Sequence, residues 1–356
     1  YSVLDSTVKP IEMNHPDFVA GVKPFIFESK VAYIVKYAKN GIGIYKNNVF
    51  MHFLPDSPLA NISTDMDVDS DGNLWIASDI DPNGKGIAKF DGFHWHNITV
   101  GEFPELLSNN FHKITVSPDG RIAAGNYGKG LVVLEPNNDH FVIKRFDNSN
   151  SKLTGLSGAE SYVVCGKPRF DNKGSLWVPV LGNQSAGASL VAFDKDYKSY
   201  GFSNTRNPSQ RYFSSLAIDN NGTKWVGGSV VSGLGLLYYN EKGQLDNSNG
   251  YYSGFLTQNE FPNIPDNTHP FIEVDRLGYV WIGTPRGLAV ITNPSNALNT
   301  NPTINVRNLN RIIGEQNINY ILVDAQNNKW LATNNGVWVI NSDGTDTVAV
   351  INKSNS

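Results

Sequence analysis

The chain has very few cysteines and no long hydrophobic stretch. Cys165 is the single cysteine among 356 residues, so no internal disulfide can form, and we expect it to be buried as a small apolar residue. No apolar run approaches the roughly 18 residues of a membrane-spanning helix, so direct insertion into a membrane is not expected. Runs of Lys and Arg never exceed two residues and the net charge is -4, so neither nucleic acid nor an anionic membrane is an expected partner.

Catalytic signatures are also missing. The sequence contains no GxSxG elbow, and its glycine-rich stretch "GGSVVSGLG" is followed by no helical pattern that could hold a phosphate. His94 and His96 lie two apart on a predicted strand and therefore on one face, where they could share a metal. No third ligand stands near them, and we interpret them as solvent-facing. We expect no catalytic residue, no metal and no cofactor.

One acidic segment at first suggests calcium binding. "DVDSDGNLWIAS", residues 67–78, begins with the DxDxDG order of an EF-hand loop. Such a loop needs a bidentate carboxylate at its twelfth position and a helix on each side, because calcium is wrapped by about six to eight oxygens. The twelfth position is Ser78, and β-forming residues follow Gly72. The segment therefore predicts a turn between two strands.

The same turn recurs along the chain. The copies are "DNKGSLWVPV" from Asp171, "DNNGTKWVGG" from Asp219, "DRLGYVWIGT" from Asp275, "DAQNNKWLAT" from Asp324 and a weaker "SPDGRIAAGN" from Ser117. Asp favours the first position of a type I turn, and Gly supplies the positive φ that closes a hairpin. Trp75, Trp177, Trp225, Trp281 and Trp330 recur at one position after the turn. We interpret these tryptophans as core residues, and not as an aromatic substrate box.

A second short apolar motif recurs seven times along the chain, and its spacing gives the repeat length. Its marker residues are Ile42, Ile87, Leu131, Leu190, Leu236, Leu288 and Val337, separated by 45, 44, 59, 46, 52 and 49 residues. Repeats of about 40 to 50 residues with four strand-like words are typical of propeller blades. The sequence predicts an all-β fold: a single seven-bladed β-propeller with four-stranded antiparallel blades at 20–57, 58–104, 105–150, 151–205, 206–263, 264–313 and 314–356.

The two ends carry further expectations. "YSVLDSTVK", at the start of residues 1–19, alternates like a strand, and we expect it to pair with the last blade and seal the ring. The alternative is that the first and last blades meet through side chains alone. "INKSNS" at 351–356 repeats "FDNSNS" at 146–151, where the segment links one blade to the next. We therefore expect further modules downstream in the same polypeptide.

The repeated sequence motifs resemble those of a known protein repeat. "DRLGYVWIGTPRGLAVI", residues 275–291, is similar to the two-component-regulator propeller repeat, which occurs in extracytoplasmic sensor regions of hybrid histidine kinases. "INYILVDAQNNKWLATNNGVWVINSDGT", residues 318–345, also resembles the propellers of PorZ-type proteins of the type IX secretion system, which share the repeat. The resemblance implies a propeller in the periplasm or on the cell surface of a Gram-negative bacterium.

The residues that form the blades do not indicate a function, because proteins with the same fold have many different functions. The loops at the axial mouth differ between copies, as on a recognition surface. Candidate ligand-binding residues there are Asn126, Tyr127, Arg211, Tyr212, His269 and Arg286. Aromatic rings with amides and charges suit a glycan or a protein ligand.

Three functional hypotheses remain. The first is a non-enzymatic extracytoplasmic recognition module of a sensor or surface assembly. The second is a surface component of the type IX secretion system. The third is a propeller lyase or hydrolase with an axial metal, against which stands the lack of repeated carboxylates or histidines on the inner strands.

Overall fold

The computed structural model describes most of the chain in two units. Described are residues 2–4, 7–9, 19–27, 30–37, 42–46, 49–53, 57–59, 62–78, 84–138, 140–182, 187–206, 211–228, 235–246, 250–268 and 271–354. The contacts divide the chain into Tyr1–Pro58 and Leu59–Ser356, and each unit is considered by itself.

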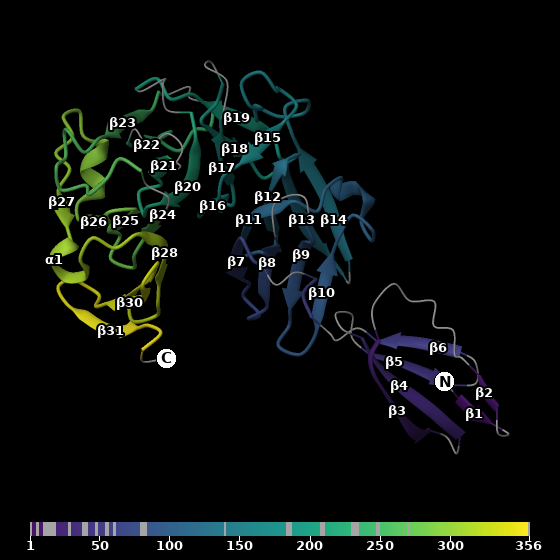
Figure 1. Ribbon diagram of the computed structural model, residues 1–356. Coiled ribbons are helices and arrows are strands. Elements are labelled where there is room, and N and C mark those ends of the chain that lie inside the picture. Colours follow the sequence, from purple (N-terminus) through teal and green to yellow (C-terminus); the bar gives the residue numbers. More distant parts are fainter. Residues whose placement is uncertain are drawn as a thin grey trace. The chain divides into compact units, whose positions relative to one another are not determined.

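The N-terminal unit contains one four-stranded antiparallel sheet and one hairpin. The sheet runs in the order β3 (Val19–Phe27), β4 (Lys30–Tyr37), β5 (Ile42–Lys46) and β6 (Val49–Phe53) (Figure 1). β1 (Ser2–Leu4) pairs with β2 (Thr7–Lys9), so the first residues have a partner within their own segment. That hairpin was not predicted, and the pairing of residues 1–9 with the last blade stays a prediction.

The second unit repeats the same antiparallel arrangement six times. The strands are β7 (Asp65–Val68), β8 (Leu74–Ser78), β9 (Gly86–Phe90), β10 (Trp95–Ile98); β11 (Phe111–Val116), β12 (Ile122–Gly128), β13 (Gly130–Asn137), β14 (His140–Phe146); β16 (Arg169–Phe170), β17 (Leu176–Leu181), β18 (Leu190–Phe193), β19 (Ser199–Phe202); β20 (Phe213–Ile218), β21 (Lys224–Gly228), β22 (Leu236–Asn240), β23 (Tyr252–Leu256); β24 (Phe271–Val274), β25 (Val280–Thr284), β26 (Gly287–Ile291), β27 (Val306–Asn308); β28 (Ile318–Val323), β29 (Lys329–Thr333), β30 (Gly336–Ile340) and β31 (Thr347–Ile351). Three short helical turns accompany them: η1 (Pro104–Leu106), η2 (Pro294–Leu298) and α1 (Asn310–Ile313). The predicted all-β class and the four-stranded antiparallel sheets are confirmed.

An additional strand joins two of these sheets. β15 (Val163–Cys165) pairs with the end of β12 on one side and with β17 on the other, which makes the strands β11 to β19 one continuous sheet. Along this ladder Tyr127 lies opposite Val164, Val164 opposite Leu181, and Leu181 opposite Tyr212. The stretch "YVVCGK" predicts an inner strand at Cys165, and a strand is present there; its pairing with two different sheets was not predicted.

The Asp/Gly turns have the predicted structural role. Oδ1 of Asp219 accepts the backbone N–H groups of Asn221 and Thr223, and Oδ2 accepts the indole N–H of Trp225 at 2.9 Å. The same Asp-to-Trp bond is 2.8–3.0 Å at the other four copies, which start at Asp69, Asp171, Asp275 and Asp324. Because these oxygens are occupied by the turn and the indole, the aspartates shape the hairpin and hold the core tryptophan.

Asp67, the first carboxylate of the apparent calcium loop, does not face the turn. Its Oδ2 accepts the hydroxyl of Thr115 and the N–H of Val116 on the neighbouring sheet. It therefore braces two sheets, which agrees with the interpretation of residues 67–78 as a hairpin.

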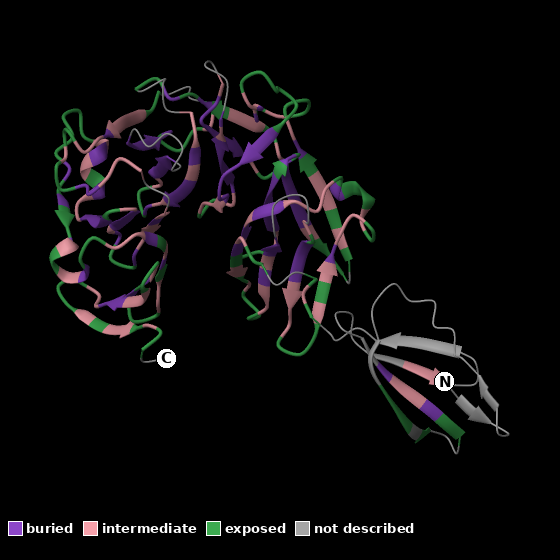
Figure 2. Cartoon of the chain, in the orientation of Figure 1, coloured by how far each residue is buried: buried purple, intermediate pink, exposed green. Residues whose placement is uncertain are grey.

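Each repeat tryptophan packs against the sheet that follows it. Trp225, on β21, lies in one apolar cluster with Ile272 and Val280 of the next sheet, and Trp75, Trp177 and Trp281 make the equivalent contacts. These four side chains are at most 2% exposed, whereas Trp330, in the last sheet, is 37% exposed. Figure 2 shows the corresponding buried inner layers of the sheets.

Buried lysines add a second link between neighbouring sheets. Lys329 Nζ lies 2.7 Å from Asp275 Oδ2 and 4.3 Å from the ring centre of Trp281, both in the preceding sheet. Lys224 lies 3.8 Å from the ring centre of Trp177 in the same way. A cation over a tryptophan face is favourable, most of all away from water. These two lysines therefore join their own sheets to the preceding ones, a role that the sequence did not reveal.

Candidate functional site

The structure brings four of the six predicted site residues to one end of the sheets. Asn126 and Tyr127 end β12, and Arg211 and Tyr212 lead into β20. The β15 ladder connects them, and the N–H of Gly182 donates to the carbonyl of Arg211 at 2.8 Å. The backbone thus holds Tyr127 and Tyr212 along one continuous row.

The other two predicted residues are less closely tied to this row. Arg286 lies in the turn between β25 and β26, its side chain is 61% exposed, and its guanidinium is 3.9 Å from the carboxylate of Glu315. Within the described ranges, no bond joins it to Tyr127 or Tyr212. His269 lies outside the described residues.

Beneath Tyr127 lie two buried polar side chains. His112, in a bulge of β11, places its ring 5.3 Å from that of Tyr127 at an interplanar angle of 90°. His112 Nε2 and Asn126 Nδ2 are buried and have no hydrogen-bond partner among the described residues. Buried polar atoms without partners are rare and are often found at functional sites. Sequence reasoning selected Asn126 and missed His112.

The state of His112 follows from its surroundings. Burial, and then the charge of neighbouring Lys113, lower the pKa of His112 to about 4, while a hydrogen bond to the Cys165 carbonyl and the charge of Asp65 act in the opposite direction. The imidazole is therefore neutral near pH 7, and one ring nitrogen donates to the carbonyl while Nε2 is available as an acceptor.

Between the inner strands, ion pairs fill the space. Lys167 Nζ lies 2.7 Å from Asp65 Oδ1 and 3.3 Å from the hydroxyl of Tyr320, so one lysine bridges two other sheets. Arg169 pairs with Glu273 at 2.6 Å. The cavity left beside these groups measures about 10 Å³, enough for about one water molecule. Single carboxylates thus do lie on inner strands, although no repeat predicted them, and Asp65 and Glu273 each have a basic partner.

The histidines considered as metal ligands lie on the outer strand side. His94 and His96 are 72% and 59% exposed, as predicted, and both approach Asp91, at 3.9 and 3.3 Å. Backbone N–H groups of His94 and Phe93 lower the pKa of Asp91 to about 2. Across the described part of the chain, no three His, Cys, Asp or Glu side chains gather as a metal site.

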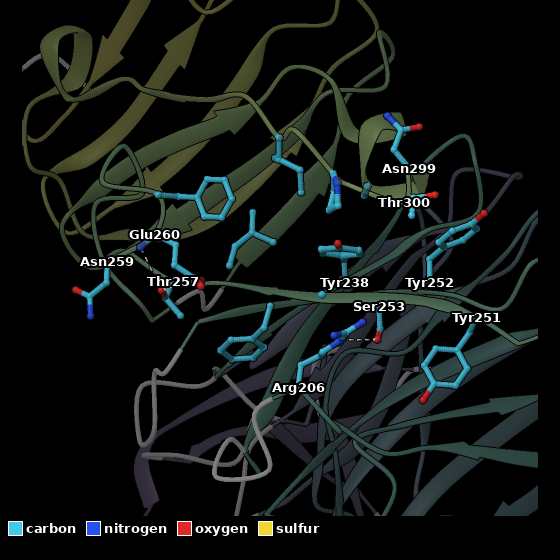
Figure 3. Close-up of a pocket in the computed structure, with 17 residues that line it drawn as sticks. Arg206, Tyr238, Tyr251, Tyr252, Ser253, Thr257, Asn259, Glu260, Asn299 and Thr300 are labelled. Carbon is cyan, nitrogen blue, oxygen red and sulfur yellow. Dashed lines mark hydrogen bonds between the residues drawn. The ribbon is translucent and has the colours of Figure 1, made fainter.

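A larger cavity surrounds the outer strand β23 and was not predicted. It measures about 890 Å³ and is lined by Arg206, Tyr238, residues 251–257, Asn259, Glu260, Phe261, Ala297, Asn299, Thr300, Pro302 and Ile304 (Figure 3). We call it the β23 groove. The stretch "GYYSGFL" with its aromatic residues was the one signal in the sequence, but alternating aromatics are as typical of an ordinary strand.

Comparisons with known proteins agree on the fold. No family model matches the chain, and no curated protein does. PorZ, a surface component of the type IX secretion system of Porphyromonas gingivalis, is similar over 94% of this chain and 51% of its own, with 19% identity and a TM-score of 0.68. The extracellular domain of the hybrid two-component system BT3049 of B. thetaiotaomicron is similar over 95% and 47%, with 17% identity and a TM-score of 0.54.

A third similar structure is an enzyme. Virginiamycin B lyase of Staphylococcus aureus is similar over 87% of this chain and 90% of its own, with 14% identity and a TM-score of 0.52. The chain spans about half the length of PorZ and of the BT3049 domain. With the four-stranded sheets, these similarities define the chain as a β-propeller protein. A helix suited to crossing a membrane is not found among the described residues.

Proposed function

We propose that this propeller is a non-enzymatic, extracytoplasmic recognition module of a bacterial sensor or surface assembly. Its ligand is a glycan or a protein that binds at the axial mouth. The observation that carries the proposal is the row of Tyr127, Arg211 and Tyr212 beside the unpartnered polar atoms of His112 and Asn126. Ring faces, a guanidinium and buried polar atoms together suit a polar ligand.

The filled space between the inner strands favours binding over catalysis. An axial metal would need carboxylates free to coordinate it. Asp65 and Glu273 instead pair with Lys167 and Arg169 in a cavity of about 10 Å³. An axial-metal lyase or hydrolase is therefore the weaker proposal, even though one similar structure is a lyase.

The assembly to which the module belongs is a second part of the proposal. Extracellular sensor domains and a type IX secretion component are both similar in fold. A membrane span and kinase downstream in the full gene would favour the sensor, and a secretion-type sorting domain would favour the secretion component.

Mutation of the mouth tests the binding proposal. Tyr127→Ala, Tyr212→Ala and Arg286→Ala should each weaken the binding of glycans on an array, or of a partner found by crosslinking, by about tenfold (about 1.4 kcal/mol). The melting temperature should stay close to that of the wild type for Arg286→Ala, because its side chain is exposed. His94→Ala, on an outer strand, is the control. Unchanged binding in all three variants would disprove the mouth as the site.

We also propose that the fold closes as a ring of seven blades. In the second unit, the first and last sheets each expose apolar side chains: Met66 and Val68 on β7 are 48% and 56% exposed, and Leu322 on β28 is 55% exposed. Blade faces gain stability when both are covered. The seventh sheet needed for this is present at β3–β6.

Thiol labelling tests the ring. Cys165 is buried and burial raises its pKa, so the wild type should react slowly. In a closed ring, Leu322→Cys should react at least tenfold more slowly than Val142→Cys, whose parent side chain is 42% exposed on β14. Equal labelling rates for the two variants would show that the β28 face is uncovered and would refute closure.

A further inference from the structure

Among the described residues, no strand pairs with the outer edge of β23. The described strands of this sheet run in the order β20-β21-β22-β23, and β23 is the last of them. Every second N–H and C=O group of β23 therefore points away from β22 and has no partner strand. The strand contains no charged residue and no proline, the usual protections of such an edge. All residues from 251 to 257 line the β23 groove, so the groove follows the edge and wraps both faces of the strand (Figure 3).

The floor of the groove is apolar and tightly packed. Tyr238 of β22 lies across Gly254 of β23, where a Cβ would stand 2.2 Å from a ring carbon. Gly254 is therefore needed for Tyr238 to lie flat. The buried side chains of Leu256, Ala297 and Ile304 continue the floor. Side chains that alternate along a bound strand would find apolar contacts here.

Opposite charges mark the two ends of the groove. Arg206 Nε donates to Ser253 Oγ at 3.2 Å, and its terminal nitrogens have no bond among the described residues. Beyond the other end of β23, Glu260 accepts the hydroxyl of Thr257 at 3.2 Å. Both charged side chains are exposed and line the groove, as Figure 3 shows. A ligand with one acidic and one basic end would be held in a single direction.

We propose that the β23 groove binds an extended peptide segment that adds to β23 as a fifth strand. A peptide backbone supplies donors and acceptors at the spacing of the free edge, and its alternate side chains can contact the apolar floor. In the antiparallel direction, a basic residue near the peptide N-terminus meets Glu260 and an acidic residue near its C-terminus meets Arg206. β23 has five residues, so the bound segment is about five residues long, roughly 17 Å.

Binding of synthetic peptides tests the proposal. The probes are a fluorescent library of the pattern Lys-X-Thr-X-Thr-X-Glu, in which X is Val, Ile, Phe or Tyr, and the same library with Lys and Glu exchanged. Fluorescence anisotropy with the full chain should show saturable binding by library members with the first charge order. Arg206→Glu should weaken it by at least tenfold, whereas Arg311→Glu, an exposed arginine on α1, should not. Thr300→Trp, which fills the groove from the opposite wall, should abolish binding.

Hydrogen exchange locates the bound peptide. Saturation should slow exchange of those backbone amides of residues 252–256 that point to the free edge, because an added strand pairs with them; the alternate amides already bond β22. The proposal is overturned if no member of either library binds at about 1 mM, or if binding is equal for Arg206→Glu and the wild type. It is also overturned if the edge-facing amides of β23 exchange as fast with the peptide as without it. A panel of neutral oligosaccharides whose binding is lost in Thr300→Trp, without peptide binding, would show instead a glycan groove.

Discussion

Replacing His112 by glutamine should make the free energy of unfolding less sensitive to mild acid than it is in the wild type. Burial holds the pKa of His112 at about 4 in the folded protein, against about 6.5 in an unfolded chain. Between these values the unfolded state binds more protons, so protonation favours unfolding. His112 thus contributes no penalty above about pH 6.5, and the folded state loses stability as the pH falls toward 4.

The expected size of the effect follows from the two pKa values. A shift of about 2.5 units corresponds to about 3.4 kcal/mol when the pH is well below 4, at 1.36 kcal/mol for each unit. At pH 5, linkage gives a loss of about 2 kcal/mol relative to pH 7.5. Glutamine does not titrate, so His112→Gln should lack this part of the pH dependence.

Urea unfolding at pH 7.5 and pH 5.0 provides the measurement. The free energy of unfolding should fall by about 2 kcal/mol more in the wild type than in His112→Gln between the two pH values. All other titrating groups are common to both proteins, so the difference isolates His112 even if glutamine lowers stability at both pH values. Equal pH dependence in the two proteins would show that His112 is not buried as a neutral imidazole.

Three further changes test the contacts that hold the blades. Asp219→Ala should lower the free energy of unfolding by about 2–3 kcal/mol in urea, because the Trp225 indole and two turn amides lose their acceptor; Asp219→Asn should lower it less, and an equal loss would contradict the hydrogen-bond argument. Lys329→Met should cost about 3 kcal/mol because Asp275 stays buried without a cation, and a neutral result would show that water reaches this carboxylate. Gly254→Ala should cost about 1–3 kcal/mol through its clash with the Tyr238 ring, and a melting temperature unchanged from the wild type would show that the ring moves freely.

The sequence predicted those features that depend only on residues close to one another along the chain. Asp219 and Trp225 are six residues apart, and the bond between them belongs to one turn, so the repeated word was enough to predict the hairpin and its core side chain. Lys224 and Lys329 were not predicted as buried, because lysine is usually exposed and the tryptophan rings that they contact lie in other sheets. The pairing of β15, although not the strand itself, was likewise not predicted, because it depends on the edges of two different sheets.

In the candidate site, too, features within one loop were predicted and features that depend on packing between distant residues were missed. Variation among the loops indicated Tyr127 and Tyr212, and the structure joins them through β15. His112 was missed because it lies on an inner strand, where its burial and its bulge result from packing across the sheet. The β23 groove was missed because it forms between residues 206 and 304, which no short motif connects.

The packing of each tryptophan on the following sheet gives the repeat array a direction. Trp75, Trp177, Trp225 and Trp281 each complete their apolar clusters only with residues that come later in the chain. During synthesis from the N-terminus, a blade that carries one of these tryptophans therefore leaves the ribosome with that side chain incompletely covered until the next blade emerges. Chains that stop directly after one of these blades would expose its tryptophan side chain, which chaperones and proteases could recognise as the sign of an incomplete propeller.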